Sequence, residues 1–486
     1  MSFAGSPPFQ RWLVFGGLIT LALRWLTRPT VLAKLPSPPG GSWIFGHFKH
    51  LLGPKGLEFQ RGVFATYGPT SVFKGFLGSQ IIFTVDPAII HTVQIKERDK
   101  FQRPKGPTIM IRSILGGGLL GLPRKNSSVL TPFGWLAHAL EQLKPTSIVF
   151  SVRQSFGKLG PFVQILPYVH RIGTPAFRQW VMSLMPSNTI QNLRRVIKLQ
   201  NEQAEEVLRA RQASLSAGDD LSTKAGRGRD IMTLLMKANE SEGSESYIDH
   251  DSMIGHMNVF IFAGHETTST AVSRILEVLS QRPDVQTRLR EELRQYFEVN
   301  PNETHYDTLL ELPYLDGIVR ETLRLYPPVP TISRMCTEDT VLPLDYPIDT
   351  PSGKITNVPI KKGARIFLSN MLFNRNKVVW GEQADEFLPE RWIGNKVDEV
   401  TRTGSRLPGV YSSMMTFGSG SYACIGFKFA VMEIKVMLAE LISNFKFEPA
   451  QEECAWVSHG IQFPYAKKDL SNSDKFPKLF LKVTKL

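Results

Sequence analysis

Cysteine is scarce in this chain, which has three in 486 residues. Cys336, Cys424 and Cys454 are widely spaced, so they suit neither a disulfide framework nor the paired CxxC motif of a structural zinc site. Small disulfide-rich scaffolds and zinc-finger modules are therefore excluded. This cysteine usage is typical of a protein that works in a reducing compartment.

A dense basic block is also missing, although the net charge is +13 at pH 7. Without such a block, the sequence gives no support for nucleic-acid binding. The positive charge suits an acidic partner or an anionic membrane surface, and a generally basic surface explains it equally well. With 42% hydrophobic and 21% charged residues, the composition is that of a globular protein.

An uninterrupted apolar run of the roughly 20 residues that span a bilayer is absent from the N-terminus. The stretch WLVFGGLITLALRWL (12–26) contains Arg24, so a membrane span, an interfacial helix and a signal peptide remain open. A stiff segment that suits a hinge, KLPSPPGGSW, follows without a clear cleavage site. The basic flank favours residues 1–33 as a membrane anchor and residues 34–486 as a cytoplasmic body.

Helical patterns dominate the rest of the chain. Apolar periodicity predicts two helices over 249–297 with a break near Arg282–Pro283, and a third over 312–330 that prolines end. Alternating patterns predict three short strands, over 79–85, 340–344 and 364–370. Polar composition predicts two loops, over 214–230 and 239–246. Because no repeat or domain linker is evident, we expect one large domain that is mainly α with a minor β portion.

A glycine-rich turn, FGSGSYACIG (417–426), holds Cys424 just before a helix-like apolar pattern. A thiolate at a helix N-terminus is stabilised by the helix dipole and by backbone N–H groups that can point at sulfur. Gly418, Gly420 and Gly426 would let the backbone pass close to a flat ligand. A single thiolate without a second protein ligand suits haem iron better than zinc, and the alternative is a small buried cysteine beside a flexible loop.

A second motif, FAGHETTST (262–270), lies inside the predicted long helix. Gly264 weakens this helix, and the hydroxyl of Thr267 or Thr268 can bond a carbonyl one turn earlier. With Glu266 beside them, these groups offer an acid and a hydroxyl that could relay protons on an otherwise apolar surface. The alternative is a core helix whose threonines are hydrogen-bonded.

A third motif consists of charges that can pair in the interior. ETLR places Glu321 and Arg324 on one helical face, and FLPERW supplies Arg391. Buried charges persist only when they are mutually paired, so we expect a Glu–Arg–Arg network that serves folding and not catalysis.

Taken in this order, the motifs resemble those of the cytochrome P450 family of haem-thiolate monooxygenases. The similarity runs from about Lys34 to Phe447 and is strongest in the C-terminal half. The sequence of these motifs and of the residues around them is similar to that of enzymes from basidiomycete fungi. The stretches that carry it are AGHETTST, RETLRLYPPVP, FNRNKVVWGEQADEFLPERW and CIGFKFAVMEIKVML.

The resemblance implies a single P450-type domain around haem b, with Cys424 as the axial ligand of the iron. It makes Thr267 and Glu266 the residues that manage oxygen activation. The same resemblance implies structural roles for the Glu321 network and an anchor in the endoplasmic reticulum membrane. Cofactor contacts would come from Arg334, which would meet a haem propionate, and from the cysteine loop, through Phe417, Gly420 and Gly426.

Two departures from the family pattern stand out. Where the family carries an arginine or histidine two residues before the cysteine, this chain has Tyr422. The family's Trp-x-x-x-Arg helix is not recognisable either, because Trp135 is followed four residues later by Ala139 in a stretch that looks shortened. Arg334 would then be the one recognisable cation left for the propionates. An arginine at position 422 would be expected to strengthen haem retention.

The function that these observations favour is insertion of one oxygen atom from O2 into an apolar small molecule. Electrons would come from NADPH through NADPH–cytochrome P450 reductase, whose acidic surface a basic face with Lys428 and Lys435 would suit. The resemblance favours fungal secondary metabolism, with a terpenoid as the substrate class. The alternatives are a haem-thiolate peroxygenase or isomerase, and a catalytically impaired protein that keeps the fold.

Overall fold

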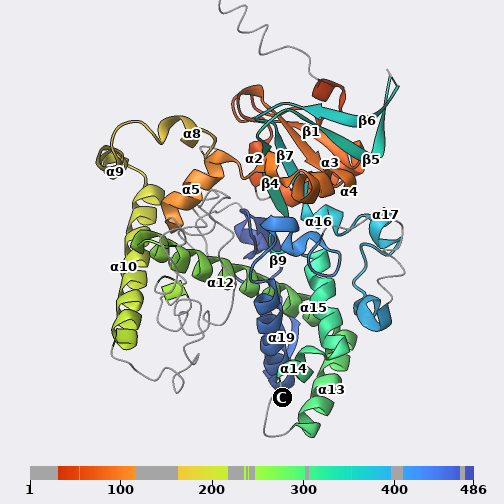
Figure 1. The fold of residues 1–486 in the computed structure, drawn as a ribbon. Coiled ribbons are helices and arrows are strands. Elements are labelled where there is room, and N and C mark those ends of the chain that lie inside the picture. Colours follow the sequence, from red (N-terminus) through yellow and green to blue (C-terminus); the bar gives the residue numbers. More distant parts are fainter. Residues whose placement is uncertain are drawn as a thin grey trace, which may run out of the picture.

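The computed structural model describes most of the chain after the N-terminal segment. The described residues are 31–53, 55–116, 163–216, 235–236, 239, 247–300, 306–351, 353–395, 409–470 and 477–486. Within these ranges the chain forms a helical part and a smaller β-rich part, which lies at the top right of Figure 1.

Two consecutive helices, α12 (His250–Gln281) and α13 (Pro283–Val299), form the long axis of the helical part. The side chain of Asp249 caps α12 by accepting a hydrogen bond from the backbone N–H of Ser252. The helix ends at Arg282 because Pro283 follows, and proline is well suited to the first turn of the next helix.

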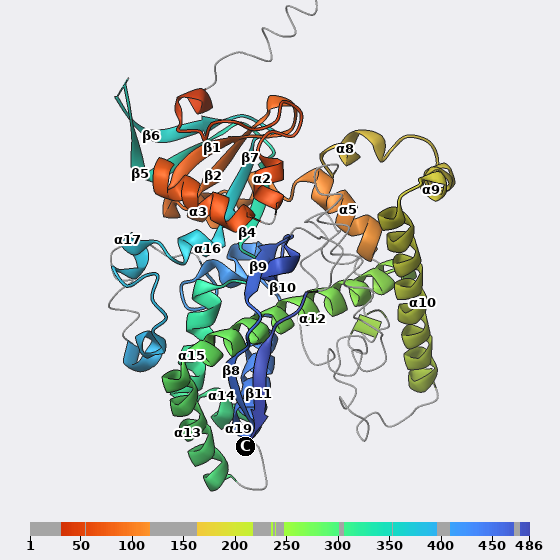
Figure 2. The same ribbon diagram turned by 180° about the vertical axis from the view of Figure 1, so that it is seen from behind.

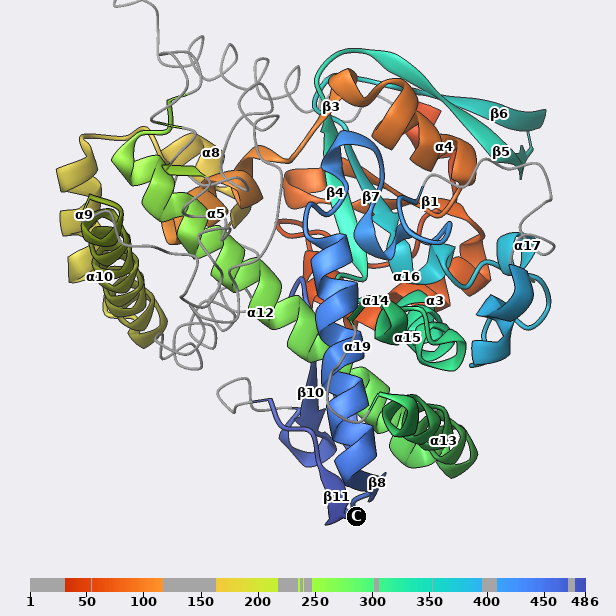
Figure 3. The ribbon, with the colours of Figure 1, turned by 60° about the horizontal axis from the view of Figure 1, so that its bottom comes forward.

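Two further helices complete the centre of the helical part. Helix α15 (Pro313–Leu325) begins with a proline in its first turn and ends before Pro327 and Pro328. Helix α19 (Phe427–Asn444) packs against α12, α13 and α15, and Figure 3 shows it crossing α12. Apolar side chains from these four helices form one of the two large cores of the protein.

The β-rich part is built on a five-stranded sheet in the order β1-β2-β7-β4-β3. Its strands are β1 (Thr70–Lys74), β2 (Gln80–Thr84), β3 (Phe101–Gln102), β4 (Thr331–Cys336) and β7 (Arg365–Ser369). Strands β2 and β7 pair in parallel although they are far apart in the sequence, and the other neighbours are antiparallel. The second large core covers this sheet and includes Phe73, Phe83 and Ile366.

The remaining elements surround these two parts. The other strands pair as β5–β6, β8–β11 and β9–β10, with bounds Thr340–Thr350, Gly353–Ile360, Phe445–Pro449, Leu481–Lys485, Cys454–Ser458 and Gln462–Ala466 in that order. The other helices are α2 (Phe48–Leu52), α3 (Gly56–Tyr67), α4 (Pro87–His91), α5 (Lys105–Leu115), α8 (Leu166–Val169), α9 (Pro175–Leu184), α10 (Asn188–Ser216), α14 (Tyr306–Leu310), α16 (Asn370–Phe373) and α17 (Lys377–Trp380). Figure 2 shows α10 as an outer helix beside the end of α12.

The predicted fold class, mainly α with a minor β portion, is confirmed, and so are the break between α12 and α13 and the three predicted strands. The predicted loop 214–230 is partly wrong, because α10 continues to Ser216. The proposed anchor stretch 12–26, Trp135 and most of the loop 239–246 lie outside the described residues. Among the residues that are described, no helix is long and apolar enough to cross a membrane.

Candidate haem-binding site

Cys424 lies in a tight loop between two single helical turns and the start of α19. The turns are η10 (Met415–Phe417) and η11 (Gly420–Tyr422). The backbone N–H of Cys424 donates a hydrogen bond to the carbonyl of Phe417 at 2.7 Å, which closes the loop. The thiol is thereby held two residues before Gly426, the residue that caps α19.

The surroundings of Gly420 require a glycine, whereas those of Gly426 do not. Gly420 has φ +59°, and a Cβ placed there would lie 2.3 Å from the carbonyl oxygen of Gln94 on η4 (Thr92–Lys96). A side chain at this position would therefore force the loop away from its neighbour. Gly426, by contrast, has φ −95° and open space around its Cβ position, so its protein surroundings do not demand a glycine.

Cys424 is an exposed residue, although protein atoms surround much of its thiol. This burial raises the pKa of the thiol, and a hydrogen bond from the backbone N–H of Gly426 partly opposes the increase. The N–H that points at sulfur agrees with the expectation for a cysteine at a helix N-terminus. Because the protein alone favours the thiol form, a cationic metal would be needed to favour the thiolate.

Helix α12 carries the second predicted group of residues and runs without a break through Gly264. The hydroxyl of Thr267 donates a hydrogen bond to the carbonyl of Ala263 at 2.7 Å, as the sequence predicted for one of its threonines. Glu266 is buried, and one of its oxygens lies 3.3 Å from Nδ1 of His265. The oxygen of Thr267 keeps its acceptor lone pairs, so it can still receive a second hydrogen bond.

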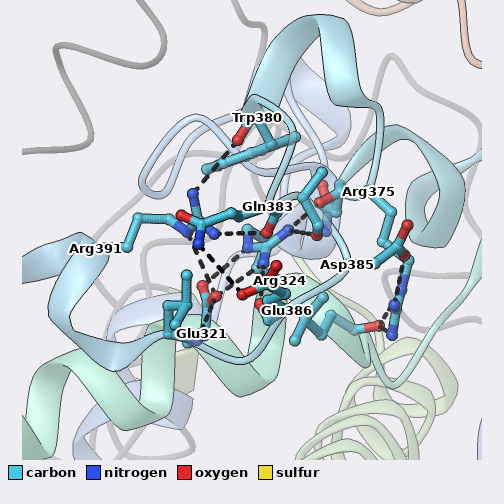
Figure 4. A network of polar contacts seen from close by, with 12 residues as sticks. Glu321, Arg324, Arg375, Trp380, Gln383, Asp385, Glu386 and Arg391 are labelled. Carbon is cyan, nitrogen blue, oxygen red and sulfur yellow. Dashed lines mark hydrogen bonds and ion pairs between the residues drawn. The ribbon is translucent and has the colours of Figure 1, made fainter.

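The third group, Glu321, Arg324 and Arg391, is brought together in the interior (Figure 4). Arg324 donates two hydrogen bonds to the carboxylate of Glu321, at 2.8 and 2.9 Å, and both side chains are fully buried. Arg391 lies 3.4 Å from the same carboxylate. Such a bidentate pair is stable in the interior only because backbone groups satisfy the remaining donors and acceptors.

This network extends to the cysteine loop through Asn374. Arg324 donates a hydrogen bond to the backbone carbonyl of Asn374 at 2.7 Å. The side chain of Asn374 in turn accepts from the backbone N–H of Met415 and donates to the hydroxyl of Thr416, at 2.8 and 2.9 Å. Since the next residue is Phe417, which accepts the bond from Cys424, the buried charges and the thiol share one continuous set of contacts.

Two guanidinium groups lie near the ring of Tyr422 in the same loop. The guanidinium carbon of Arg334 lies 4.4 Å from the ring centroid, and that of Arg103 lies 5.5 Å from it. Arg334 is buried and its Nε has no hydrogen-bond partner. Arg103 was not predicted from the sequence. The one feature that could have pointed to it is its positive charge directly after the short strand β3.

These residues fit a haem group. One accessible thiol at a helix N-terminus suits the iron, and the buried Nε of Arg334 suits a carboxylate of the porphyrin. The structure places Arg334 and Cys424 on neighbouring segments, while Thr267 lies on α12, the helix that packs against α19. A mainly helical protein with a loop-held thiol and buried cations nearby is the class that the fold and the site define.

The chain belongs to the cytochrome P450 family. Residues 145–460 match the family that is described as Cytochrome P450. The chain is 33% identical to Cytochrome P450 monooxygenase 91 of Postia placenta, over 93% of this chain and 95% of that protein. It is 30% identical to a ganoderic acid synthetase of Ganoderma lucidum, over 98% of this chain and 96% of that protein. The recognition from sequence is therefore confirmed, and the protein is an oxidoreductase of a family that uses thiolate-ligated haem b and electrons supplied by a reductase.

The comparisons also show where the family match begins and how the length of the chain compares with that of a relative. The family match begins at residue 145, after the segment in which no Trp-x-x-x-Arg pattern was found. The alignment with the Postia placenta relative spans 521 positions, more than the 486 residues of this chain. The relative therefore has residues without a counterpart in this chain.

The predicted basic face needs one correction. Lys428 is exposed, but Lys435 is buried, lies 2.6 Å from a carboxylate oxygen of Asp316 and donates to the carbonyl of Leu310. A lysine that is neutralised and buried in this way cannot attract an acidic partner. Its role is to join α19 to α15.

The buried network generates a stability prediction. Glu321→Gln removes the negative charge but keeps the shape, and it leaves Arg324 as an uncompensated buried cation. We predict a loss of about 3–5 kcal/mol in the free energy of unfolding, measured by denaturant titration. The control is Glu382→Gln, which removes an exposed pair with Lys377 and should cost less than ~1 kcal/mol. Equal, small losses in both variants would show that the network is not a structural lock.

Proposed function

We propose that this protein is a haem-thiolate monooxygenase in which Cys424 is the axial ligand. The single observation that carries the proposal is the exposed Cys424 at the N-terminus of α19, whose backbone N–H donates a hydrogen bond to the Phe417 carbonyl, in a chain of the cytochrome P450 family. The other two cysteines differ from it. Cys336 is buried in the sheet core, and Cys454 lies on β9 beside the chain terminus.

When bound, the haem supplies the iron at which dioxygen is reduced, and the thiolate adds electron density that favours O–O cleavage. Cys424 would hold the group from one side. The N–H of Gly426 would stabilise the negative sulfur, and the tight contact of Gly420 with η4 would keep the loop in place. Arg334 would hold a carboxylate at the edge of the group.

Thr267 and Glu266, which lie on α12, are proposed to control protons. The hydroxyl of Thr267 donates to the Ala263 carbonyl and can receive a hydrogen bond at its oxygen. Glu266 is buried on the same helix, beside His265, and can exchange a proton through that neighbour. A proton that is delivered by fixed groups reaches the pocket without admitting bulk water.

The proposed substrate is an apolar small molecule. The half-buried residues just before Gly264 on α12, Phe260, Ile261 and Phe262, supply apolar surface on the same helix as Thr267. Relatives named ganoderic acid synthetase and Cytochrome P450 monooxyhenase eriI support a place in fungal secondary metabolism. A terpenoid is the substrate class that we propose.

For location and partners, we propose residues 1–33 as the membrane anchor and residues 34–486 as the catalytic domain. The domain would lie on the cytoplasmic side of the endoplasmic reticulum membrane and receive electrons from NADPH–cytochrome P450 reductase. The proposal rests on the apolar stretch, its basic flank and the family membership.

The first test is the role of Cys424. Cys424→Ser replaces the sulfur by a far poorer ligand, so we predict loss of the thiolate-type Soret band in the reduced, carbon-monoxide-bound protein and loss of monooxygenase activity. The matched control is Cys454→Ser, which should leave both unchanged. A thiolate-type band that survived Cys424→Ser would refute the proposed ligand.

A second test concerns Thr267. Thr267→Ala should bind haem normally but lower the ratio of product formed to NADPH consumed, because protons are delivered without control and reducing equivalents leave as hydrogen peroxide. The substrate would be an apolar compound that perturbs the haem spectrum. Ser269→Ala is the control, since its exposed hydroxyl also bonds a carbonyl four residues earlier. An unchanged ratio in Thr267→Ala would remove this residue from the mechanism, and activity with hydrogen peroxide alone would favour the peroxygenase alternative.

The membrane assignment has its own test. Deletion of residues 1–33 should move the protein to the soluble fraction after ultracentrifugation while the haem spectrum is retained. If the truncated protein still sediments with membranes, another surface dominates the attachment.

A further inference from the structure

The ring of Tyr422 is the common neighbour of two cationic side chains that come from distant parts of the sequence. Arg103 follows β3, Arg334 belongs to β4, and these two strands pair with each other in the sheet. Both guanidinium carbons lie within cation–π distance of the ring, at 5.5 and 4.4 Å. The hydroxyl of Tyr422 donates to the carbonyl of Phe101 at 3.4 Å, which ties the ring to β3.

The two cations share an environment that suits an anion. Burial lowers the pKa of Arg334 to about 10, and the positive charge of Arg103 adds to this decrease. Burial lowers the pKa of Arg103 as well. Among the described residues, no carboxylate lies within ion-pair distance of Arg334, whose guanidinium bonds only the Ser333 carbonyl and Gln94.

Other buried polar atoms around the same loop also lack partners. They include Nε2 of Gln94 and the hydroxyl of Ser419, in addition to Nε of Arg334. Gln94 touches the loop at Gly420, so these donors belong to one region. Buried donors without acceptors cost free energy, and a ligand with several acceptor oxygens would remove that cost.

We propose that Tyr422 takes the place of a cation by holding Arg103 and Arg334 against its ring, so that these two arginines bind the carboxylates of the haem propionates. This inference rests on the proposed haem site. Tyr422 is a positioning residue in this arrangement, and the ring face supplies an attractive contact for two like charges that repel each other. The site is then complete without a cation at position 422.

From the sequence, Tyr422→Arg is expected to strengthen haem retention, and this arrangement predicts the opposite effect. An arginine at this position would add a third cation and remove the ring that the other two contact. We therefore expect Tyr422→Arg to weaken haem binding. Tyr422→Phe keeps the ring and loses only a long hydrogen bond, so it should stay close to the wild type.

The experiment compares haem with its dimethyl ester, in which both propionate charges are absent. Binding of each to the apo-protein is measured by absorbance titration, and release by transfer to an excess of an apo-haem acceptor. The wild type should prefer haem over the ester. Arg103→Gln and Arg334→Gln should each reduce this preference by about tenfold to a hundredfold, the range of a charge-assisted hydrogen bond.

The variants at position 422 complete the test. Tyr422→Leu should also reduce the preference for haem over its dimethyl ester, whereas Tyr422→Phe should retain this preference. Arg98→Gln is the control, because it removes an exposed cation and should leave the preference unchanged. An unchanged preference in Arg103→Gln and Tyr422→Leu would overturn the inference, while a thiolate-type spectrum in the same samples would leave the proposed function standing. Failure of the wild type to bind haem at all would instead refute the proposed function.

Discussion

The buried pairing of Glu321 with Arg324 is the contact on which the site depends most. Two fully buried charges hold each other at 2.8 Å, and removing Glu321 would leave Arg324 without a compensating charge. Because Arg324 also binds the carbonyl of Asn374, and Asn374 binds both Met415 and Thr416, the pair fixes the approach to the cysteine loop. The thiol is therefore positioned by charges in α15 as well as by its own turn.

The same loop meets a second electrostatic environment on its other side. There the charges are the buried Arg334 and the half-buried Arg103 beside the ring of Tyr422, and the described contacts of Arg334 include no carboxylate. The carboxylate of Glu321 compensates the buried arginines of its network, whereas the described contacts of Arg334 leave room for an anionic ligand. In the proposed function, Cys424 would hold the iron of the haem, and Arg103 and Arg334 would hold its carboxylates.

Local patterns were enough to predict α12, α13, α15 and α19, because each begins or ends at a capping residue or a proline and has helical periodicity. They also singled out Cys424, Thr267 and the charged pair as candidates; the pairing of Glu321 with Arg324 is confirmed, whereas the roles of Cys424 and Thr267 are proposals that come from the family resemblance. The contact of Arg103 with Tyr422 could not be predicted, since it depends on the pairing of β3 with β4 across more than 200 residues. For the same reason, Lys435 was predicted as an exposed basic residue although Asp316 neutralises it in the interior.

The central claim is that Cys424 provides the sulfur ligand of a haem iron. The most direct measurement is X-ray absorption at the iron edge on the haem-loaded protein in which Cys336 and Cys454 are replaced by serine, so that Cys424 is the one remaining cysteine. The account predicts one sulfur atom in the first coordination shell of the iron. A first shell that contains only nitrogen and oxygen would contradict it.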